Sequence, residues 1–330
     1  MNREPQSAAR RRLIAEALGL FSWPGEYPKI MEKRDIKEKI RSLALDAGFV
    51  RARFLAPLES GQAALPEPYQ TRAPSLLTAA LVYGNCFEEP PEGEKGEIPP
   101  ERRAWIAPFA QRNYYREAVK RLQGLSREFR ACFGGKKADF RILCNSPAPE
   151  KPPALASGLG APGRNGLVLC REAGSLFVIA AMTLPYELEG DRPEEAGDFP
   201  LCSGCGGENP PCAAACPVGA LRGDGKLNRG RCIQWYASGH GGEVPAETAR
   251  HWGRRLYGCT ACQDACPWNR RPIRGVESAE GFLPPFFDAE KLLSLDDDEL
   301  KALFRGSALG FSWLGPDAIR RNAGLVLGEI

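Results

Sequence analysis

The chain has 330 residues, of which 43% are apolar and 26% charged, and its 44 basic and 41 acidic side chains give a formal charge of +3. This composition excludes a chain that is disordered throughout, because the apolar fraction is large enough to build a core. It also excludes a polycation, so any nucleic-acid surface must be local, and no apolar run reaches the ~18 residues of a membrane span.

The first 30 residues carry little pattern, and we expect them to form an extension outside the core fold. Three arginines precede a short apolar run that contains Glu16, and no small-residue cleavage site follows it. The run is therefore not a secretion signal. We expect a reducing, cytoplasmic compartment, in which cysteines act as ligands or catalytic groups rather than in disulfides.

Residues 31–198 have the mixed pattern of an α/β domain. Asp35 is expected to cap a helix that stops at Gly48, and a long basic helix is expected at 113–133. Alternating or buried apolar runs predict strands at 49–55, 76–83, 139–143, 167–170 and 176–183.

Residues 275–330 predict a C-terminal segment of short helices. The first is expected at 295–304, with Ser294 at its start and an acidic first turn. The last is expected at 316–327.

The most informative feature is a cluster of cysteines at 199–274, between the mixed domain and the C-terminal helices. The chain has 12 Cys and only 2 His, which disfavours metal sites built on imidazole. Eight of the cysteines form two runs, each of which ends in Cys-Pro: Cys202, Cys205, Cys212 and Cys216, then Cys232, Cys259, Cys262 and Cys266.

This spacing is typical of a ferredoxin-like domain with two [4Fe–4S] clusters. In the two-cluster ferredoxin pattern, the cysteine before proline binds the cluster of the other run. The rule predicts one cluster on Cys202, Cys205, Cys212 and Cys266, and a second on Cys216, Cys232, Cys259 and Cys262. The gap of six residues before Cys212 is longer than the usual two, but a loop rich in Gly and Pro can still deliver the thiolate.

Two other readings of these cysteines remain open at this point. Two zinc sites would use paired Cys-x2-Cys knuckles but have no use for the Cys-Pro tails, and a disulfide framework would need an oxidising compartment. Three further cysteines, Cys86, Cys132 and Cys170, are expected to be small core residues.

The sequence around the second run resembles the epoxyqueuosine reductase family. The similar stretches are Arg-Cys-Ile at 231–233 and Leu-Tyr-Gly-Cys-Thr-Ala-Cys-Gln-Asp-Ala-Cys-Pro-Trp-Asn at 256–269. Upstream, the resemblance continues through Asn-Tyr-Tyr at 113–115 and without a gap from Cys144 to Asn165, and near the end it includes Arg-Arg-Asn-Ala-Gly at 320–324. It covers roughly residues 35 to 330 and marks the chain as a divergent member.

The resemblance implies an α+β fold in which a cobalamin-type α/β domain precedes the two-cluster domain. The implied activity is that of an oxidoreductase, the reduction of an epoxide on a modified tRNA base to an alkene in queuosine synthesis. The implied cofactors are two [4Fe–4S] clusters and a cobalamin without a protein imidazole ligand, and the implied cofactor contacts are Asn145, Gly163, Arg164, Asn165 and Thr260.

One position departs from the family pattern. The family's proton donor is an aspartate just before a Ser-x-Pro turn, and the ungapped match places Cys144 there. A thiol can donate a proton if it is protonated at the working pH, so Cys144 is the predicted catalytic residue. Asp139 and Glu150 are the next candidates, and the alternative is that the acid is lost.

A local basic surface is predicted between 217 and 274, where 10 Lys and Arg face 4 Asp and Glu. Trp235, Tyr236, Trp252, Tyr257 and Trp268 are interleaved with these charges. Such a surface can bind RNA phosphates and stack on an unpaired base, or it can balance the negative charge of the clusters.

Three functions are compatible with these patterns. They are a cobalamin-dependent tRNA reductase, an enzyme of the same build that reduces another small electrophile, and a non-catalytic electron carrier. The carrier is disfavoured, because it does not need a whole α/β domain ahead of its clusters. The expected partners are tRNA and an electron donor such as flavodoxin or ferredoxin, and the chain is expected to be a monomer.

Overall fold

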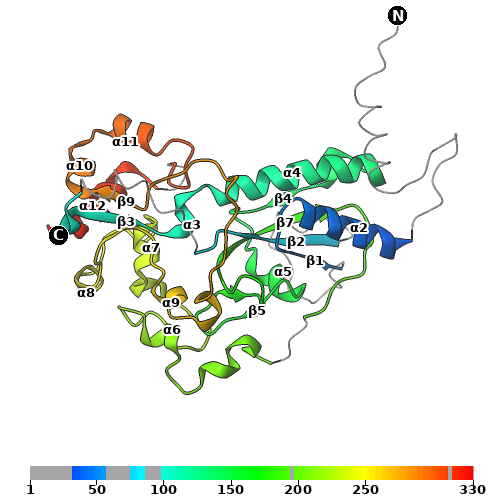
Figure 1. Cartoon of the computed structure of the whole chain (residues 1–330), viewed down its shortest axis with the longest axis horizontal. Coiled ribbons are helices and arrows are strands. Elements are labelled where there is room, and N and C mark those ends of the chain that lie inside the picture. The colour runs from blue at the N-terminus through cyan, green and yellow to red at the C-terminus, as the bar shows by residue number, and fades with distance from the viewer. Residues whose placement is uncertain (1–31, 57–74, 86–97, 194–196, 311–313, 330) are drawn as a thin grey trace, which may run out of the picture.

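The computed structural model describes residues 32–56, 75–85, 98–193, 197–310 and 314–329 (Figure 1). The predicted extension at 1–30 and Cys86 lie outside these residues. In the described part of the chain, no helix is long and apolar enough to cross a membrane.

The first domain is built on a four-stranded antiparallel sheet with the order β1-β2-β7-β4. Its strands are β1 (Arg51–Leu55), β2 (Ser75–Val82), β4 (Ile142–Leu143) and β7 (Phe177–Leu184). β2 lies at the centre, and all eight of its residues are buried. An antiparallel strand with two buried faces must be covered on both sides of the sheet.

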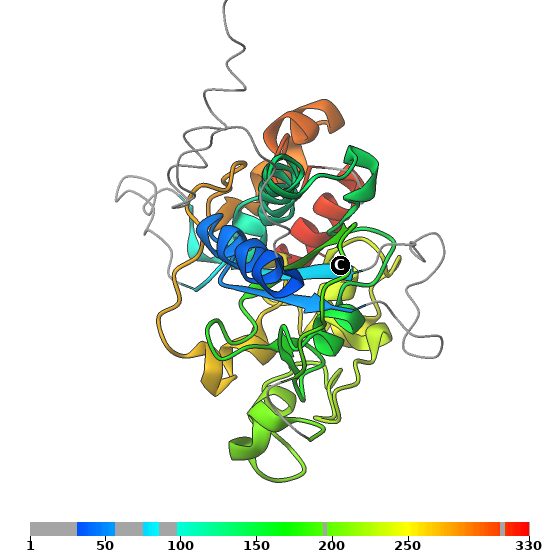
Figure 2. The ribbon, with the colours of Figure 1, turned by 90° about the vertical axis from the view of Figure 1, so that its right-hand side faces the viewer.

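Helices supply that cover (Figures 1 and 2). Helices α2 (Lys33–Asp46) and α4 (Tyr114–Phe133) lie on one face, and α5 (Lys151–Ala156) lies on the other with the hairpin of β5 (Ala161–Pro162) and β6 (Val168–Leu169). The long helix begins as predicted, because Asn113 Oδ1 accepts a hydrogen bond from the N–H of Arg116 at 3.1 Å.

A second sheet joins three distant parts of the chain. Its order is β8-β3-β9, and β3 (Arg103–Ile106) runs parallel to β8 (Arg255–Tyr257) and antiparallel to β9 (Phe286–Asp288). Helices α10 (Ala289–Ser294), α11 (Asp297–Leu303) and α12 (Pro316–Leu327) pack beside it. The strands of this sheet come from the first domain, the cysteine-rich region and the C-terminal segment, so the three are fixed together.

The cysteine-rich region consists of short helices and turns. Its helices are α6 (Pro211–Ala214), α7 (Ile233–Ala237), α8 (Ala246–Arg250) and α9 (Ala261–Asp264), with 3-10 turns at Pro200–Cys205, Arg229–Arg231 and Pro267–Asn269. The remaining elements are α3 (Pro108–Gln111) and 3-10 turns at Pro100–Arg102 and Lys137–Asp139. Mixed helix and sheet with an antiparallel main sheet confirm the predicted α+β class.

Three predicted element boundaries are wrong, and in two cases a hydrogen bond between a side chain and a nearby backbone group explains the difference. Helix α2 starts at Lys33, so Asp35 lies in its first turn and does not cap it. The strand predicted at 139–143 is reduced to two residues, because the Asp139 carboxylate accepts a hydrogen bond from Lys136 N–H and closes a turn. Asp296, not Ser294, caps α11, since only Asp296 forms a capping box with Glu299.

Candidate active site

The eight cysteines of the two runs gather in two groups of four. One group, here called the outer group, lines a small recess: Cys202, Cys205, Cys212 and Cys266. The other, the inner group, lines a much larger cavity: Cys216, Cys232, Cys259 and Cys262. These are the two sets predicted by the rule that the cysteine before each proline binds the cluster of the other run, here called the exchange. The assignment of each thiol as a ligand stays a prediction.

The exchange is built on two similar short helices, α6 and α9, which pack against each other. Each helix carries one cysteine, Cys212 in α6 and Cys262 in α9. In both cases the cysteine four residues further along lines the cavity of the other group. The contact between the helices therefore brings thiols from the two sequence runs together.

The inner thiols need bound cations to act as thiolates. Burial, followed by the nearby charges of Cys259 and Cys232, raises the pKa of Cys262 to about 12. Four closely grouped thiolates can persist in such a site only with metal bound, because metal binding displaces their protons. Among the described residues, no three His, Cys, Asp or Glu side chains lie where they could hold a single metal ion. The four thiols of each group instead line a cavity or recess.

Arg164 fixes the six-residue excursion of the outer group. Its guanidinium donates hydrogen bonds to the carbonyl oxygens of Gly223 at 2.7 Å, Gly207 at 2.9 Å and Gly206 at 3.5 Å. Arg164 also lines the recess of the outer cysteines. Arg164, which the resemblance implies as a cofactor contact, thus lies beside the outer group. It is not among the described residues that line the large cavity.

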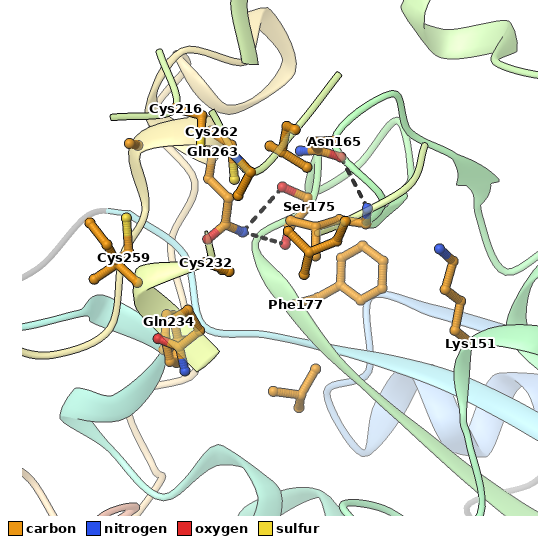
Figure 3. A pocket seen from close by; sticks show the side chains of 18 of the residues that line it. Lys151, Asn165, Ser175, Phe177, Cys216, Cys232, Gln234, Cys259, Cys262 and Gln263 are labelled. Carbon is orange, nitrogen blue, oxygen red and sulfur yellow. Dashed lines mark hydrogen bonds between the residues drawn. The ribbon is translucent and has the colours of Figure 1, made fainter. Parts of the chain in front are cut away.

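The large cavity lies between the first domain and the cysteine-rich region and has a volume of about 440 Å³ (Figure 3). Residues of β7 and the loop after α6 line it with apolar side chains: Phe177, Val178, Ile179, Val218, Leu221 and Leu227. Figure 3 shows the inner cysteines on one side of this space and Phe177 and Lys151 on the other. Its size and apolar lining are those of a small-molecule or cofactor site.

A buried hydrogen-bond network joins the two walls of the cavity. Gln263, next to Cys262, donates from Nε2 to Tyr83 Oη at 2.7 Å and to the backbone oxygen of Ser175 at 3.0 Å. Asn269 accepts from Ser175 N–H at 2.9 Å and donates to the Gln263 carbonyl at 2.9 Å. The last residue of the Cys-Pro-Trp-Asn stretch therefore locks the inner group against the sheet domain.

The backbone at 144–145 decides which of two side chains faces the cavity. Asn145 has a φ of 48°, and among the described residues no other residue except glycine has a positive φ. This left-handed turn places Asn145 in the cavity lining, which does not include Cys144. The Cys144 Sγ lies 3.6 Å from the Ile179 carbonyl oxygen, and burial, with a smaller effect of Glu150, raises its pKa to about 12.

The other predicted cofactor contacts have different surroundings. Asn165 lines both the large cavity and the outer recess, and its Oδ1 accepts a hydrogen bond from Leu167 N–H. Gly163 lies in the β5–β6 hairpin, where an added Cβ would meet Leu169 Cδ1 at 2.0 Å. Thr260 donates to the Asp264 carboxylate within its own helix turn and is not among the described lining residues.

Sequence reasoning did not single out Tyr83, Tyr115 or Gln234, which also line the cavity. The Gln234 Oε1 is buried and has no hydrogen-bond partner among the described residues. A signal existed for two of them, since Tyr115 ends the Asn-Tyr-Tyr stretch and Gln234 follows Cys232 by two residues. Tyr83 has none, because it is the last apolar residue after a buried strand.

The predicted basic surface is only partly as expected. Nine of its ten cations are exposed, and the tenth, Arg255, is half-buried. Three of its five aromatic residues, Tyr236, Trp252 and Tyr257, are buried in the core, so they cannot stack on a base. Trp235 and Trp268 are half-buried, each under an arginine.

The remaining cysteines divide into three cases. Cys170 is buried, as predicted, whereas Cys132 is exposed on α4 and is not a core residue. Cys144 is half-buried beside the main core.

Comparison with known proteins identifies the cysteine-rich region. Residues 201–269 match a family described as a 4Fe-4S double cluster binding domain. The prediction of two [4Fe–4S] clusters is thereby confirmed, in place of zinc sites or disulfides.

The whole chain is similar to epoxyqueuosine reductases, as its motifs predict. It is 26% identical to that of Lactococcus garvieae over 326 residues, covering 90% of this chain and 87% of the relative. It is 34% identical to that of Pseudomonas aeruginosa over 226 residues (67% and 57%) and 27% identical to that of Vibrio cholerae over 255 residues (76% and 66%). The chain thus matches less than two thirds of the length of the latter two relatives.

Solved structures share the fold. The epoxyqueuosine reductase of Streptococcus thermophilus matches with a TM-score of 0.73 and 22% identity, covering 89% of this chain and 81% of that one. An epoxyqueuosine reductase bound to an epoxyqueuosine-modified tRNA stem loop matches with a TM-score of 0.73 and 23% identity, covering 90% and 82%.

Proposed function

We propose that the chain is an iron–sulfur oxidoreductase that reduces epoxyqueuosine to queuosine in tRNA. One observation carries the proposal: the inner cysteines and the sheet domain line the same cavity. A cluster held by these thiols would lie in the cavity wall and could pass electrons directly to a molecule bound there. The similarity to epoxyqueuosine reductases gives the substrate class.

We propose that part of a cobalamin occupies the large cavity, since the whole cofactor is larger than its volume of about 440 Å³. The apolar side chains of β7 and of the loop after α6 would contact the faces of a large ring. Gln234 lies in the same lining, and its Oε1 is buried without a hydrogen-bond partner among the described residues, so a turn of this side chain toward a polar group of the cofactor would satisfy that atom. When bound, the cofactor would supply a low-valent cobalt for reductive chemistry on the epoxide.

The two cysteine groups suggest a direction of electron flow. The outer group is flanked by the exposed residues Ser203, Gly204 and Gly206, whereas the inner group lines the cavity. An electron donor such as flavodoxin or ferredoxin would reduce the outer cluster, and electrons would pass from it to the inner cluster. Exposed Arg270 and Arg271, close in sequence to Cys266, would attract an acidic donor.

The chain's own residues hold the walls of the site in place. The network of Gln263, Ser175 and Asn269 holds the inner group at a fixed place relative to β7. Lys151 donates to the Gly166 carbonyl at 2.7 Å and so fixes the hairpin turn at the far wall. Rigid walls of this kind keep reacting groups aligned.

The nine exposed cations of the basic surface support tRNA as the partner, because they can bind phosphates. The further proposals are a monomer in the cytoplasm, an extension at 1–30, and domains at 31–198, 199–274 and 275–330. The proposed ligands are the four thiols of each cysteine group.

A second function is favoured by one observation. The predicted catalytic thiol of Cys144 is not in the cavity lining, so the chain has no acid of the family's kind at the expected place. An enzyme of the same build could reduce another small electrophile that needs no such acid.

The test uses the full chain, purified without oxygen and supplied with cobalamin. We expect it to convert epoxyqueuosine in tRNA to queuosine when a low-potential reductant is present, as seen by mass spectrometry of digested tRNA. Cys262→Ala should abolish conversion, and Cys132→Ala, which removes an exposed thiol, should leave it unchanged. A fully loaded native protein that binds cobalamin but leaves the epoxide intact would refute the tRNA function.

A further inference from the structure

A reductive removal of an epoxide oxygen needs protons as well as electrons. The conversion takes up two electrons and two protons, both carbon–oxygen bonds break, and the oxygen leaves as water. The clusters supply the electrons from an external low-potential donor. The first broken bond leaves an alkoxide, which is a strong base, so a proton donor in the cavity would accelerate this step.

Apart from the four inner cysteines, the described lining of the cavity has four titratable groups, and two of them already form hydrogen bonds within the walls. The Tyr83 hydroxyl donates to the Ser175 carbonyl at 3.1 Å and accepts from Gln263 Nε2. The Lys151 ammonium donates to the Gly166 carbonyl. The Tyr83 proton is thus bound within the cavity wall, and the Lys151 ammonium, anchored at the Gly166 carbonyl, lies on the side away from the inner cysteines (Figure 3).

The other two are Glu150 and Tyr115. Glu150 Oε1 accepts a hydrogen bond from Ser146 N–H at 3.3 Å, which is the role of an acceptor oxygen. The hydroxyl of Tyr115 has no hydrogen-bond partner among the described residues, although the side chain lines the cavity. A phenol has one proton to give and here has no protein acceptor for it.

We propose that the hydroxyl of Tyr115 donates the proton to the epoxide oxygen as the first carbon–oxygen bond breaks. The inference rests on the proposed function and replaces Cys144 as its donor. The phenolate left behind regains a proton from water, and the second proton of the reaction also comes from water.

The neighbourhood of Tyr115 supports this role. The residue lies in the first turn of α4, two residues after the capping residue Asn113, so its backbone is fixed. Burial, with smaller effects of Tyr257, Cys144 and Glu150, raises the pKa of the Tyr115 hydroxyl. The phenol therefore keeps its proton at neutral pH and gives it only to a strong base such as the alkoxide.

The same geometry explains the position of Cys144. Its Sγ lies 3.9 Å from the backbone oxygen of Tyr115, so the thiol packs behind the tyrosine. Cys144 therefore supports Tyr115 from outside the cavity.

The test compares Tyr115→Phe with Tyr114→Phe in the cobalamin-loaded protein. Tyr114 is the neighbouring tyrosine, its hydroxyl is 3.5 Å from the Tyr83 carbonyl, and it lies in the core. In single turnovers with pre-reduced protein, we expect Tyr115→Phe to slow epoxide reduction by ~10²-fold or more, the usual effect of losing a positioned acid. Tyr114→Phe should react at nearly the native rate.

Two readouts separate chemistry from folding. Iron content, the absorption spectrum of bound cobalamin and the dissociation constant for tRNA should be unchanged in Tyr115→Phe, and the solvent deuterium effect on the rate should be lost. A Tyr115→Phe protein that reacts at the native rate overturns the inference, and a loss in Glu150→Gln instead would make the carboxyl group the donor. If the native protein does not reduce the epoxide at all, the proposed function itself fails.

Discussion

The side chain of Asn269 should hold the cluster region against the sheet domain, and its removal has a measurable local cost. Asn269 is buried, and its amide satisfies the Ser175 N–H and the Gln263 carbonyl at 2.9 Å each. In Asn269→Ala, the Ser175 N–H loses its partner, whereas the Gln263 carbonyl still accepts from Cys266 N–H at 3.1 Å. An unsatisfied buried group costs about 1–3 kcal/mol, so the opening of this contact should become easier by about that amount.

Hydrogen exchange measures this directly, because the amide of Ser175 is one of the two groups. Since 1.4 kcal/mol corresponds to a factor of ten, the Ser175 amide should exchange at least ~5-fold faster in the variant than in the native protein. Asn228→Ala, a change at an exposed position of the same region, should alter stability by less than about 0.5 kcal/mol. If Ser175 exchanges at the native rate in Asn269→Ala protein with full iron content, the amide does not hold this contact.

Three further predictions concern the cysteine groups, the half-buried Arg164 and the Asp191 carboxylate. Cys202→Ala and Cys266→Ala should disturb the same cluster. The native iron content of about eight per chain should fall in both variants and stay unchanged in Cys132→Ala. If electron paramagnetic resonance shows that the two variants lose different clusters, the exchange is wrong. Arg164→Met removes three hydrogen bonds to backbone oxygens, so the outer cluster should be lost to oxygen faster than the inner one; equal rates of loss would show that the arginine does not hold the loop. Burial by itself would raise the pKa of Asp191, but hydrogen bonds from an arginine, a lysine and a backbone amide lower it overall. Its contribution to stability is therefore present above the unfolded pKa of ~3.9 and is lost as the pH falls through the lower folded value. Asp191→Asn should lower the free energy of unfolding by ~1–3 kcal/mol at pH 7 and by much less at pH 2, as measured by urea denaturation at both pH values; equal losses at the two pH values would refute the ionic origin.

The sequence predicted the elements that depend on local signals. The helix at 114–133 follows from an asparagine cap and an apolar face, and both are present. The helix at 316–327 has the predicted bounds. The strand at 139–143 was wrong because Asp139 closes a turn with the backbone of Lys136, a competition that alternation of apolar residues does not report.

The sequence alone also determined the chemistry of the cysteine region. The spacing of thiols along the chain limits which of them can reach one cluster, so two Cys-Pro runs predicted two clusters and the composition of each group. Spacing acts over a few residues, where the covalent chain restricts the distance between side chains. It therefore carries information without any knowledge of the fold.

The tertiary structure decided which residues face the cavity. Cys144 and Asn145 are neighbours in the chain, but the left-handed backbone of Asn145 places only the second in the lining. Tyr115 and Gln234 are brought to the same cavity from α4 and α7, which are more than a hundred residues apart. A cavity is made by packing between distant segments, and the direction of a side chain into it depends on backbone angles that no local pattern of residue types specifies.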